Sequence, residues 1–243
     1  MADSETQLVE PLVAANRILA NEGIIDVLGH VSARSTRDSQ EFLLSCSRSP
    51  HNVCAADIMR YRLDCTPVTQ SSERPYAERM IHGAIYAVRP DVQAVVHTHS
   101  RNVLPFASSG VIIRPVIHAG TMFHDGVAWF DEYDAGGNLL VSTPTEGAAL
   151  ATALGQRSGV ILRNHGCAVV GANLTLAVMA AFYLDENARV QMEATKLGRI
   201  IFIDAEEAQR AAKVFHSLLV QQRAWDYWLK RLPSNWRADA DLA

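Results

Sequence analysis

The stretch Asp91-Val92-Gln93-Ala94-Val95-Val96-His97-Thr98-His99-Ser100 carries the strongest structural signal in this chain. It follows the turn-forming Arg89-Pro90-Asp91, and its apolar and small residues are typical of a buried β-strand. Side chains alternate between the two faces of a strand, so His97 and His99 point to the same side at its end. Two imidazoles placed in this way are able to share one divalent cation, with bonds of about 2.1 Å for zinc. The alternative is that one or both are hydrogen-bonded residues of the core or of a turn.

A third histidine occupies a similar position further along the chain. His165 lies in a polar turn after the apolar run that starts at Gly159, and Gly166 permits either close backbone packing or a positive φ. Three imidazoles on two strand ends form a ligand set that leaves coordination positions open for water or substrate. We therefore predict a catalytic site with one divalent metal ion, and such ligands suit zinc, manganese and iron(II) alike.

The composition indicates a globular protein that acts on small molecules. Of the 243 residues, 49% are hydrophobic and 20% are charged, which supplies ample material for a core. The formal charge of -4, without a Lys/Arg-rich segment, argues against nucleic acid as the partner. Four cysteines without CxxC spacing predict reduced thiols. Because we find no signal sequence and no membrane-length apolar run, we expect a cytoplasmic protein.

Helical and strand patterns alternate without a linker, so we predict one α/β domain over residues 1–243. The predicted helices cover residues 7–21, 76–88, 143–154, 173–197 and 205–228. The predicted strands cover 91–97, 111–117 and the short apolar run from Gly159 that ends in the His165 turn, together with an antiparallel hairpin of 26–35 and 41–45. The C-terminal helix and tail, about 205–243, contain Trp225, Trp228 and Trp236. Such a segment packs either on the core or on another subunit.

Two further segments carry polar groups suited to chemistry. Glu78 and His82 are four apart on the helix predicted upstream of the histidine strand, which places them on one face. The Glu78 carboxylate is able to reach the metal or to act as an acid/base group, and an ordinary solvated glutamate is the alternative. Ser47, Arg48 and Ser49 offer hydroxyls and a guanidinium to an anionic ligand, although a solvated turn has the same composition.

The order of these pieces resembles the class II aldolase/adducin family over roughly residues 8–220. The resemblance rests on Glu78-x3-His82, Arg89-Pro90-Asp91 through His97-Thr98-His99-Ser100, Asn164-His165-Gly166, and Gly29-x-Val31-Ser32-x-Arg34. It implies a single three-layer α/β/α domain with a central, largely antiparallel sheet. It also implies one divalent ion per subunit held by His97, His99 and His165, with Glu78 as the acid/base residue. Many members of the family are tetramers with active sites at subunit interfaces, so we expect a homo-oligomer of this kind.

The chain departs from the sugar-phosphate aldolases of the family where those enzymes form a phosphate cradle. It has His30 in place of an asparagine, Ser47-Arg48-Ser49-Pro50 in place of a serine-glycine turn, and Tyr76-Ala77 in place of a serine pair. An imidazole, a guanidinium and a phenol suit a planar, hydroxylated aromatic carboxylate better than a phosphate. The sequence is in this respect similar to the metal-dependent decarboxylases of the family, which act on substrates such as 3,4-dihydroxyphthalate or a hydroxypyridine dicarboxylate.

The resemblance therefore predicts a carboxy-lyase. In this hypothesis the metal chelates a phenolic oxygen and a neighbouring carboxylate, loss of CO2 leaves a metal-stabilised carbanion or dienolate, and Glu78 protonates the ring carbon. Ser47, Arg48 and Ser49 hold a substrate carboxylate, and His30 hydrogen-bonds a hydroxyl or carboxylate. One alternative is a metal-dependent aldolase acting on a non-phosphorylated hydroxy-keto acid. The other is a non-catalytic adducin-like binding protein, which we expect to lack the histidine set.

Overall fold

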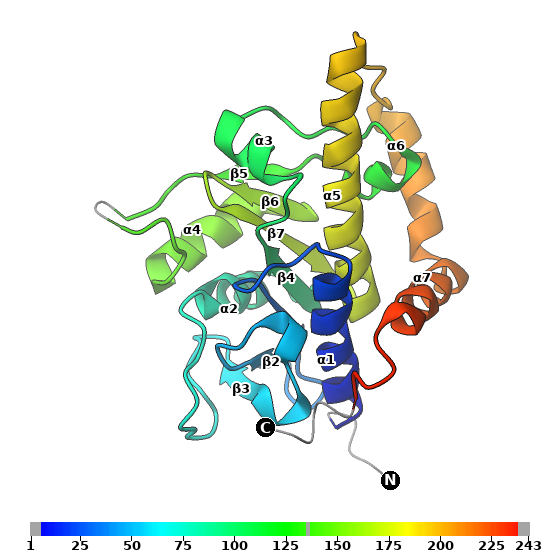
Figure 1. The fold of residues 1–243 in the computed structure, drawn as a ribbon. Helices are drawn as coiled ribbons and strands as arrows, with labels where there is room; N and C mark the ends of the chain where they lie inside the picture. Colours follow the sequence, from blue (N-terminus) through cyan, green and yellow to red (C-terminus); the bar gives the residue numbers. More distant parts are fainter. Residues whose placement is uncertain (1–5, 135–136, 238–243) are drawn as a thin grey trace.

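A seven-stranded sheet forms the centre of the molecule (Figure 1). The computed structural model describes residues 6–134 and 137–237. In the order β3-β2-β1-β4-β7-β6-β5, every neighbouring pair of strands is antiparallel except β5 with β6. The strands are β1 (His30–Arg34), β2 (Glu41–Ser45), β3 (Ile58–Arg62), β4 (Ala94–Thr98), β5 (Ala128–Phe130), β6 (Gly159–Leu162) and β7 (Gly166–Gly171). The prediction of a largely antiparallel sheet is confirmed.

Helices cover both faces of this sheet and complete the three predicted layers (Figure 1). The helices are α1 (Thr6–Asn21), α2 (Arg79–Val88), α3 (Leu104–Ser109), α4 (Pro144–Leu154), α5 (Leu174–Leu197), α6 (Ala205–Ala212) and α7 (Leu218–Arg231). On one face α1 and α5 pack with α7 outside them, and on the other face α2 and α4 pack. The side chains of β4 alternate between the layers, because Ala94 and Val96 join the first apolar cluster and Val95 joins the second.

The same alternation decides where the histidine of β4 points. His97 shares the face of Val95, so its ring lies on the side of the sheet that α2 and α4 cover. The pairing of β4 with β7 sets Thr98 opposite Cys167, which brings the β6–β7 turn and its His165 beside the end of β4. Segments far apart in the sequence therefore meet at this end of the strand.

Much of the predicted local structure is confirmed. The predicted elements that the structure contains include the helices at 7–21, 143–154 and 173–197 and the hairpin of 26–35 with 41–45. Thr143 caps α4, since its hydroxyl accepts the Glu146 N–H at 3.2 Å and Glu146 accepts the Thr143 N–H at 3.0 Å. The helix predicted from 76 begins only at Arg79. Residues before it are held in an extended bridge, in which Arg74 O accepts the Ser47 N–H at 2.7 Å.

The prediction of a strand over 111–117 is wrong. This segment is irregular and lies beside α5, where two amide side chains hydrogen-bond to it. Gln191 accepts the Arg114 N–H and donates to Ile112 O, both at 2.9 Å, and Asn187 donates to Arg114 O at 2.9 Å. The apolar pattern misled the prediction because helix side chains, and not a neighbouring strand, satisfy these backbone groups.

Replacing Asn187 with leucine is expected to lower the free energy of unfolding by about 2 kcal/mol, because it leaves Arg114 O and the Val116 N–H, which are partly buried, without their partner. The Asn187 side chain is 1% exposed, so solvent does not replace the lost bonds. Urea denaturation measures the change. Glu193→Gln, an exposed change on the same helix, serves as the control and should stay within about 0.5 kcal/mol of the parent. Equal stability of the two variants would contradict the assignment.

The single helix predicted over 205–228 is also wrong. Asp204 caps α6, but α6 ends at Ala212, and a 3-10 turn and an extended Ser217 separate it from α7. Phe215 in the turn is buried against His118, with ring centroids 5.3 Å apart, and this contact redirects the chain.

The tryptophan-rich end of the chain packs on the core, one of the two possibilities that its composition allows. Trp228 and Trp236 are buried in the apolar cluster formed with α1 and α5. None of the helices in the described parts of the chain combines the length and the apolar composition that a membrane crossing requires.

Candidate metal centre

Four side chains converge at the end of β4. Glu78, His97, His99 and His165 each offer one ligand atom, and these atoms lie within 4.8 Å of one another. The Nε2 atoms of His97 and His99 are 3.2 Å apart, and Glu78 Oε2 is 3.6 Å from Nε2 of both His97 and His165. The structure thus brings together all four residues that the sequence analysis singles out for metal binding and acid/base chemistry.

Local backbone geometry places His165 in this cluster. The β6–β7 turn contains Asn164 with φ of 56°, a left-handed conformation that asparagine tolerates. A Cβ atom on Gly166 would lie 2.4 Å from Thr98 O, so this glycine serves close packing and not a positive φ. The turn therefore approaches the end of β4 closely enough for its histidine to reach the other two.

Hydrogen bonds on the far side of two imidazoles fix their orientation. His97 Nδ1 lies 3.1 Å from Cys167 O, and His99 Nδ1 lies 3.0 Å from a carboxylate oxygen of Asp26. A carbonyl and a carboxylate only accept, so both Nδ1 atoms carry the proton and, in the neutral rings, both Nε2 atoms present lone pairs. Two lone pairs 3.2 Å apart cannot bond to each other. A cation between them removes this repulsion, so the donor set fits a metal ion.

Burial sets the charge of these groups. Burial and the neighbouring histidines hold the pKa of His97 well below its usual value, and burial lowers the pKa of His165 to about 4. Both rings are therefore neutral at pH 7, as metal ligands must be. Burial raises the pKa of Glu78 to about 7, although a hydrogen bond from the Val141 N–H acts in the opposite direction. A carboxyl group that titrates near neutrality is suited to proton transfer.

Sequence reasoning missed Asp26. Its Oδ1 accepts the N–H groups of Leu28 and Gly29, both at 3.0 Å, and the same carboxylate holds His99. Burial tends to raise the pKa of Asp26, but these hydrogen bonds and His99 hold it below its usual value. Asp26 is thus an anion that orients a candidate metal ligand. Nothing in the spacing of the sequence connects it with His99, because only the folded chain brings the two together.

The residues predicted to bind substrate line a cleft beside the four-residue cluster. This cleft has a volume of about 650 Å³ and is lined by residues that include His30, Ser47, Arg48, Ser49, Tyr76, Glu78, Leu28 and Leu140. Arg48 Nε forms an ion pair with Asp57 at 2.7 Å, which holds the guanidinium at the wall. His30 is 1% exposed, and its Nε2 has no hydrogen-bond partner among the described residues. The structure therefore places the anion-binding candidates around one opening.

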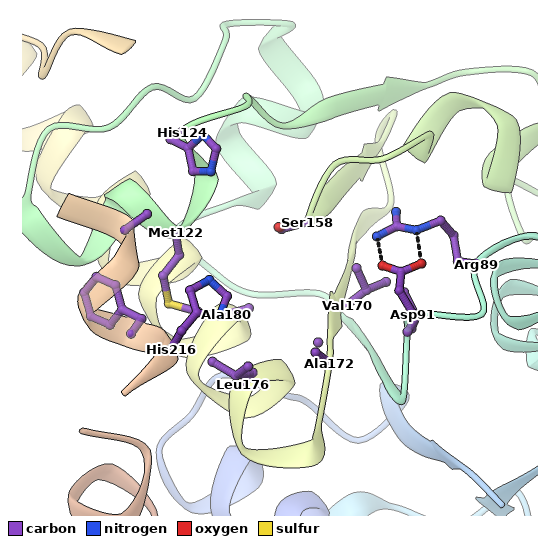
Figure 2. A pocket seen from close by; sticks show the side chains of 14 residues that line it. Arg89, Asp91, Met122, His124, Ser158, Val170, Ala172, Leu176, Ala180 and His216 are labelled. Carbon is purple, nitrogen blue, oxygen red and sulfur yellow. Dashed lines mark hydrogen bonds and ion pairs between the residues drawn. The ribbon is translucent and has the colours of Figure 1, made fainter. Parts of the chain in front are cut away.

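A second cavity, of about 190 Å³, lies at the opposite end of β4 and β7 (Figure 2). Arg89 and Asp91 face each other in it, and Figure 2 shows their paired contacts, at 2.8 and 2.7 Å. The remaining Arg89 nitrogen donates to Gly155 O at 2.6 Å, so all three guanidinium nitrogens are engaged. The other side chains that Figure 2 labels are mainly apolar. We therefore place the functional site at the histidine cluster.

This fold and this site define a class of protein, the three-layer α/β/α proteins with a cluster of three histidines and a glutamate that is able to hold a metal ion. The chain matches the family model "Class II Aldolase and Adducin N-terminal domain" over residues 10–192. It belongs to this family, as the sequence resemblance predicts.

Within this family, the chain is similar to proteins that are named decarboxylases and to a solved aldolase structure. The chain is 30% identical to "Decarboxylase tropJ" of Talaromyces stipitatus, over 92% of this chain and 93% of that protein. It is 29% identical to a "3,4-dihydroxyphthalate decarboxylase" of Arthrobacter keyseri, over 93% of this chain and 94% of that protein. A solved structure of L-fuculose 1-phosphate aldolase from Glaciozyma antarctica is 27% identical, with a TM-score of 0.80 over 96% of this chain and 92% of that one. The predicted fold and the prediction of a carbon–carbon lyase are confirmed.

Proposed function

We propose that this protein is a metal-dependent decarboxylase of a hydroxylated aromatic carboxylate of the 3,4-dihydroxyphthalate type. The observation that carries the proposal is the convergence of Glu78 and three histidines on a cleft that also holds His30 and Arg48. Relatives that are named decarboxylases, one of them for this substrate, support it.

His97, His99 and His165 would hold the divalent ion, and their nitrogen donors suit zinc, manganese or iron(II). Hydrogen bonds fix the tautomers of His97 and His99. When bound, such an ion supplies a Lewis acid that stabilises negative charge as it develops on the substrate. Asp26 keeps His99 in the orientation that this role requires.

Glu78 carries the proton transfer in this proposal. Its Oε1 accepts the Val141 N–H at 3.1 Å, which leaves Oε2 directed at the histidine cluster. With a pKa of about 7 the group is partly protonated at neutral pH, so it is able to donate a proton to the ring carbon that has lost CO2. Because Glu78 lines the cleft, a substrate bound there would have this acid within reach.

The anion-binding residues hold the substrate. Arg48, kept in place by Asp57, offers a charge-assisted contact to a substrate carboxylate, with the Ser47 and Ser49 hydroxyls beside it. His30, which lines the same cleft, contacts a second oxygen substituent on the ring. Leu28 lines the same cleft and provides an apolar surface for the ring.

The test is a CO2-release assay with 3,4-dihydroxyphthalate and related aromatic dicarboxylates, on protein reconstituted with zinc, manganese or iron(II). Release of CO2 at a rate that depends on the metal supports the proposal. Release of an aldehyde or pyruvate from a hydroxy-keto acid, without CO2 from any aromatic dicarboxylate, would favour the aldolase alternative that the likeness to L-fuculose 1-phosphate aldolase raises.

Replacing Arg48 with alanine is expected to raise KM about 10- to 100-fold with kcat changed less than about 3-fold, because a charge-assisted bond to bound substrate is lost. Steady-state kinetics measures both values. Arg62→Ala, an exposed arginine of the same half of the chain, should leave KM unchanged. An unchanged KM in the Arg48 variant would remove this residue from substrate binding.

We further propose that residues 1–243 act as one domain and that the protein assembles as a homotetramer, or a multiple of one, with active sites at subunit interfaces. The family resemblance supports this assembly. Light scattering coupled to size-exclusion chromatography tests it, and a monomeric mass with full activity would contradict it.

A further inference from the structure

A chain of hydrogen bonds leads from the cleft into the core. His30 Nδ1 lies 2.6 Å from His82 Nε2, and His82 Nδ1 lies 2.6 Å from Ser32 Oγ. Ser32 Oγ lies 2.8 Å from the phenolic oxygen of Tyr86. Each of these four side chains is at most 1% exposed, so water does not compete for these hydrogen bonds. His30 is the member that lines the cleft.

Two proton arrangements of this chain are possible, and they are opposite in direction. In the first, Tyr86 donates to Ser32, Ser32 donates to His82 Nδ1, and His82 Nε2–H donates to His30 Nδ1. His30 then carries its proton on Nε2. In the reversed arrangement His30 Nδ1–H donates to His82 Nε2, and His30 Nε2 presents a lone pair. The hydrogen bonds alone therefore connect the tautomer of His30 to the hydroxyl of Tyr86.

The environment of Tyr86 decides between the two arrangements. Its phenolic oxygen accepts a backbone hydrogen bond from Val95, and Ser32 is the side-chain partner of the hydroxyl. If Ser32 donated to Tyr86, the phenolic proton would remain buried without an acceptor, which is unfavourable. The Arg34 guanidinium lies over the Tyr86 ring, 4.8 Å from its centroid, and a cation there strengthens the phenol as a donor. The first arrangement gives an acceptor to every proton between Tyr86 and His30, and the one proton left without an acceptor among the described residues is the His30 Nε2–H, on the residue that lines the cleft.

His30 and His82 are both neutral, and only a neutral imidazole has the choice between an Nδ1–H and an Nε2–H tautomer. Burial is the largest influence on each ring and lowers the pKa of His82 to about 3 and that of His30 well below its usual value. Each ring therefore carries one proton, and its position is set by its neighbours.

We propose that Tyr86, Ser32 and His82 are positioning residues that fix His30 as an Nε2–H donor toward the cleft. This inference rests on the proposed function for the identity of the ligand. His30 then binds an acceptor oxygen, a carboxylate or phenolate of the aromatic substrate, and is unsuited to accept a hydroxyl proton or to act as a base. The cleft selects rings with a second anionic oxygen group in addition to the carboxylate held by Arg48.

The direct test is a 15N–1H correlation spectrum of the histidine side chains in the zinc-loaded protein. The His30 signals are assigned by their loss in His30→Gln. The expected result is an Nε2–H tautomer for His30 and for His82. An Nδ1–H tautomer of His30 would overturn the inference, and this readout depends on no substrate.

The Tyr86→Phe variant tests the role of the phenol, because it removes one oxygen and keeps the ring. Without the Tyr86 donor, Ser32 is able to point either way, so the His30 signals should shift toward a mixture of the two tautomers. A residue that acts only by packing would leave the tautomer unchanged, and an unchanged spectrum would contradict the positioning role.

A pair of variants at His82 tests the consequence for binding, with phthalate as a non-reactive probe and calorimetry as the measurement. His82→Leu leaves His30 Nδ1 without its donor and should weaken phthalate binding about 10-fold or more. His82→Gln places an amide donor near the same nitrogen and should restore binding to within about 3-fold of the parent. Equal weakening in both variants would contradict the inference. If the parent itself does not bind phthalate, the proposed substrate class fails, while the spectrum still decides the tautomer.

Discussion

Replacing Glu78 with glutamine is expected to lower kcat at least about 1,000-fold while the protein keeps its metal. Glutamine has the same shape and still offers an oxygen to the Val141 N–H, so the fold around the site is retained. Its amide has no proton to transfer near neutral pH, whereas the parent carboxyl group has a pKa of about 7. The measurements are kcat from CO2 release and metal content from elemental analysis.

Glu73→Gln provides the matched control, because Glu73 is exposed and lies five residues before Glu78. It should leave both kcat and metal content unchanged. In deuterated water the parent should place deuterium at the ring carbon that loses CO2. Full turnover in the Glu78 variant would exclude the carboxyl group as the proton donor. Loss of metal together with activity would instead assign Glu78 to metal binding.

The histidine pair was predictable because it depends on a local rule. In a strand, residues two apart share a face, and β4 extends through His97, so His97 and His99 face the same side whatever the rest of the fold does. His165 required one assumption more, that its turn lies next to β4. The antiparallel pairing of β4 with β7 brings this turn next to the end of β4.

The position of Glu78 shows where a local rule fails. Helical spacing predicted that Glu78 and His82 share one face, but Glu78 is the N-cap of α2, with a non-helical ψ of 16°. Its carboxylate turns to the histidine cluster, while His82 bonds to His30 and Ser32 in the core. The end of a helix depends on the segment that precedes it, and here the extended bridge before α2 sets it.

The sequence analysis selected His30 but could not predict its neighbours, and it missed Asp26, because both placements depend on long-range register. β1 pairs with β4 so that His30 lies opposite His97, and this register brings His30 to the cleft. Asp26 reaches His99 across 73 positions of sequence for the same reason. The pattern of residues in a single sequence does not say which strands pair or in which register. The contact of Asp26 with His99 was therefore found only in the structure.

Metal removal is expected to lower the melting temperature of the parent protein, and zinc is expected to restore it. At a free zinc concentration 1,000 times Kd the gain in unfolding free energy is about 4.1 kcal/mol. For a chain of this length that gain corresponds to a rise in Tm of roughly 8–16 °C. The physical reason is that the ion binds the folded protein, in which the Nε2 atoms of His97 and His99 are held 3.2 Å apart, and not the unfolded chain.

His165→Ala should abolish this zinc-dependent rise and CO2 release together, because it leaves too few nitrogen donors to hold the ion. His165 is a turn residue and not part of the β4 core, so the metal-free variant should melt close to the metal-free parent. Scanning calorimetry with and without zinc measures both effects, and His51→Ala, which removes an exposed histidine outside the cluster, is the control. A zinc-dependent rise that persists in His165→Ala would mean that the ion is held elsewhere. Such a result would also remove the physical basis for assigning Glu78 and the cleft to catalysis, since both depend on the ion being at this point.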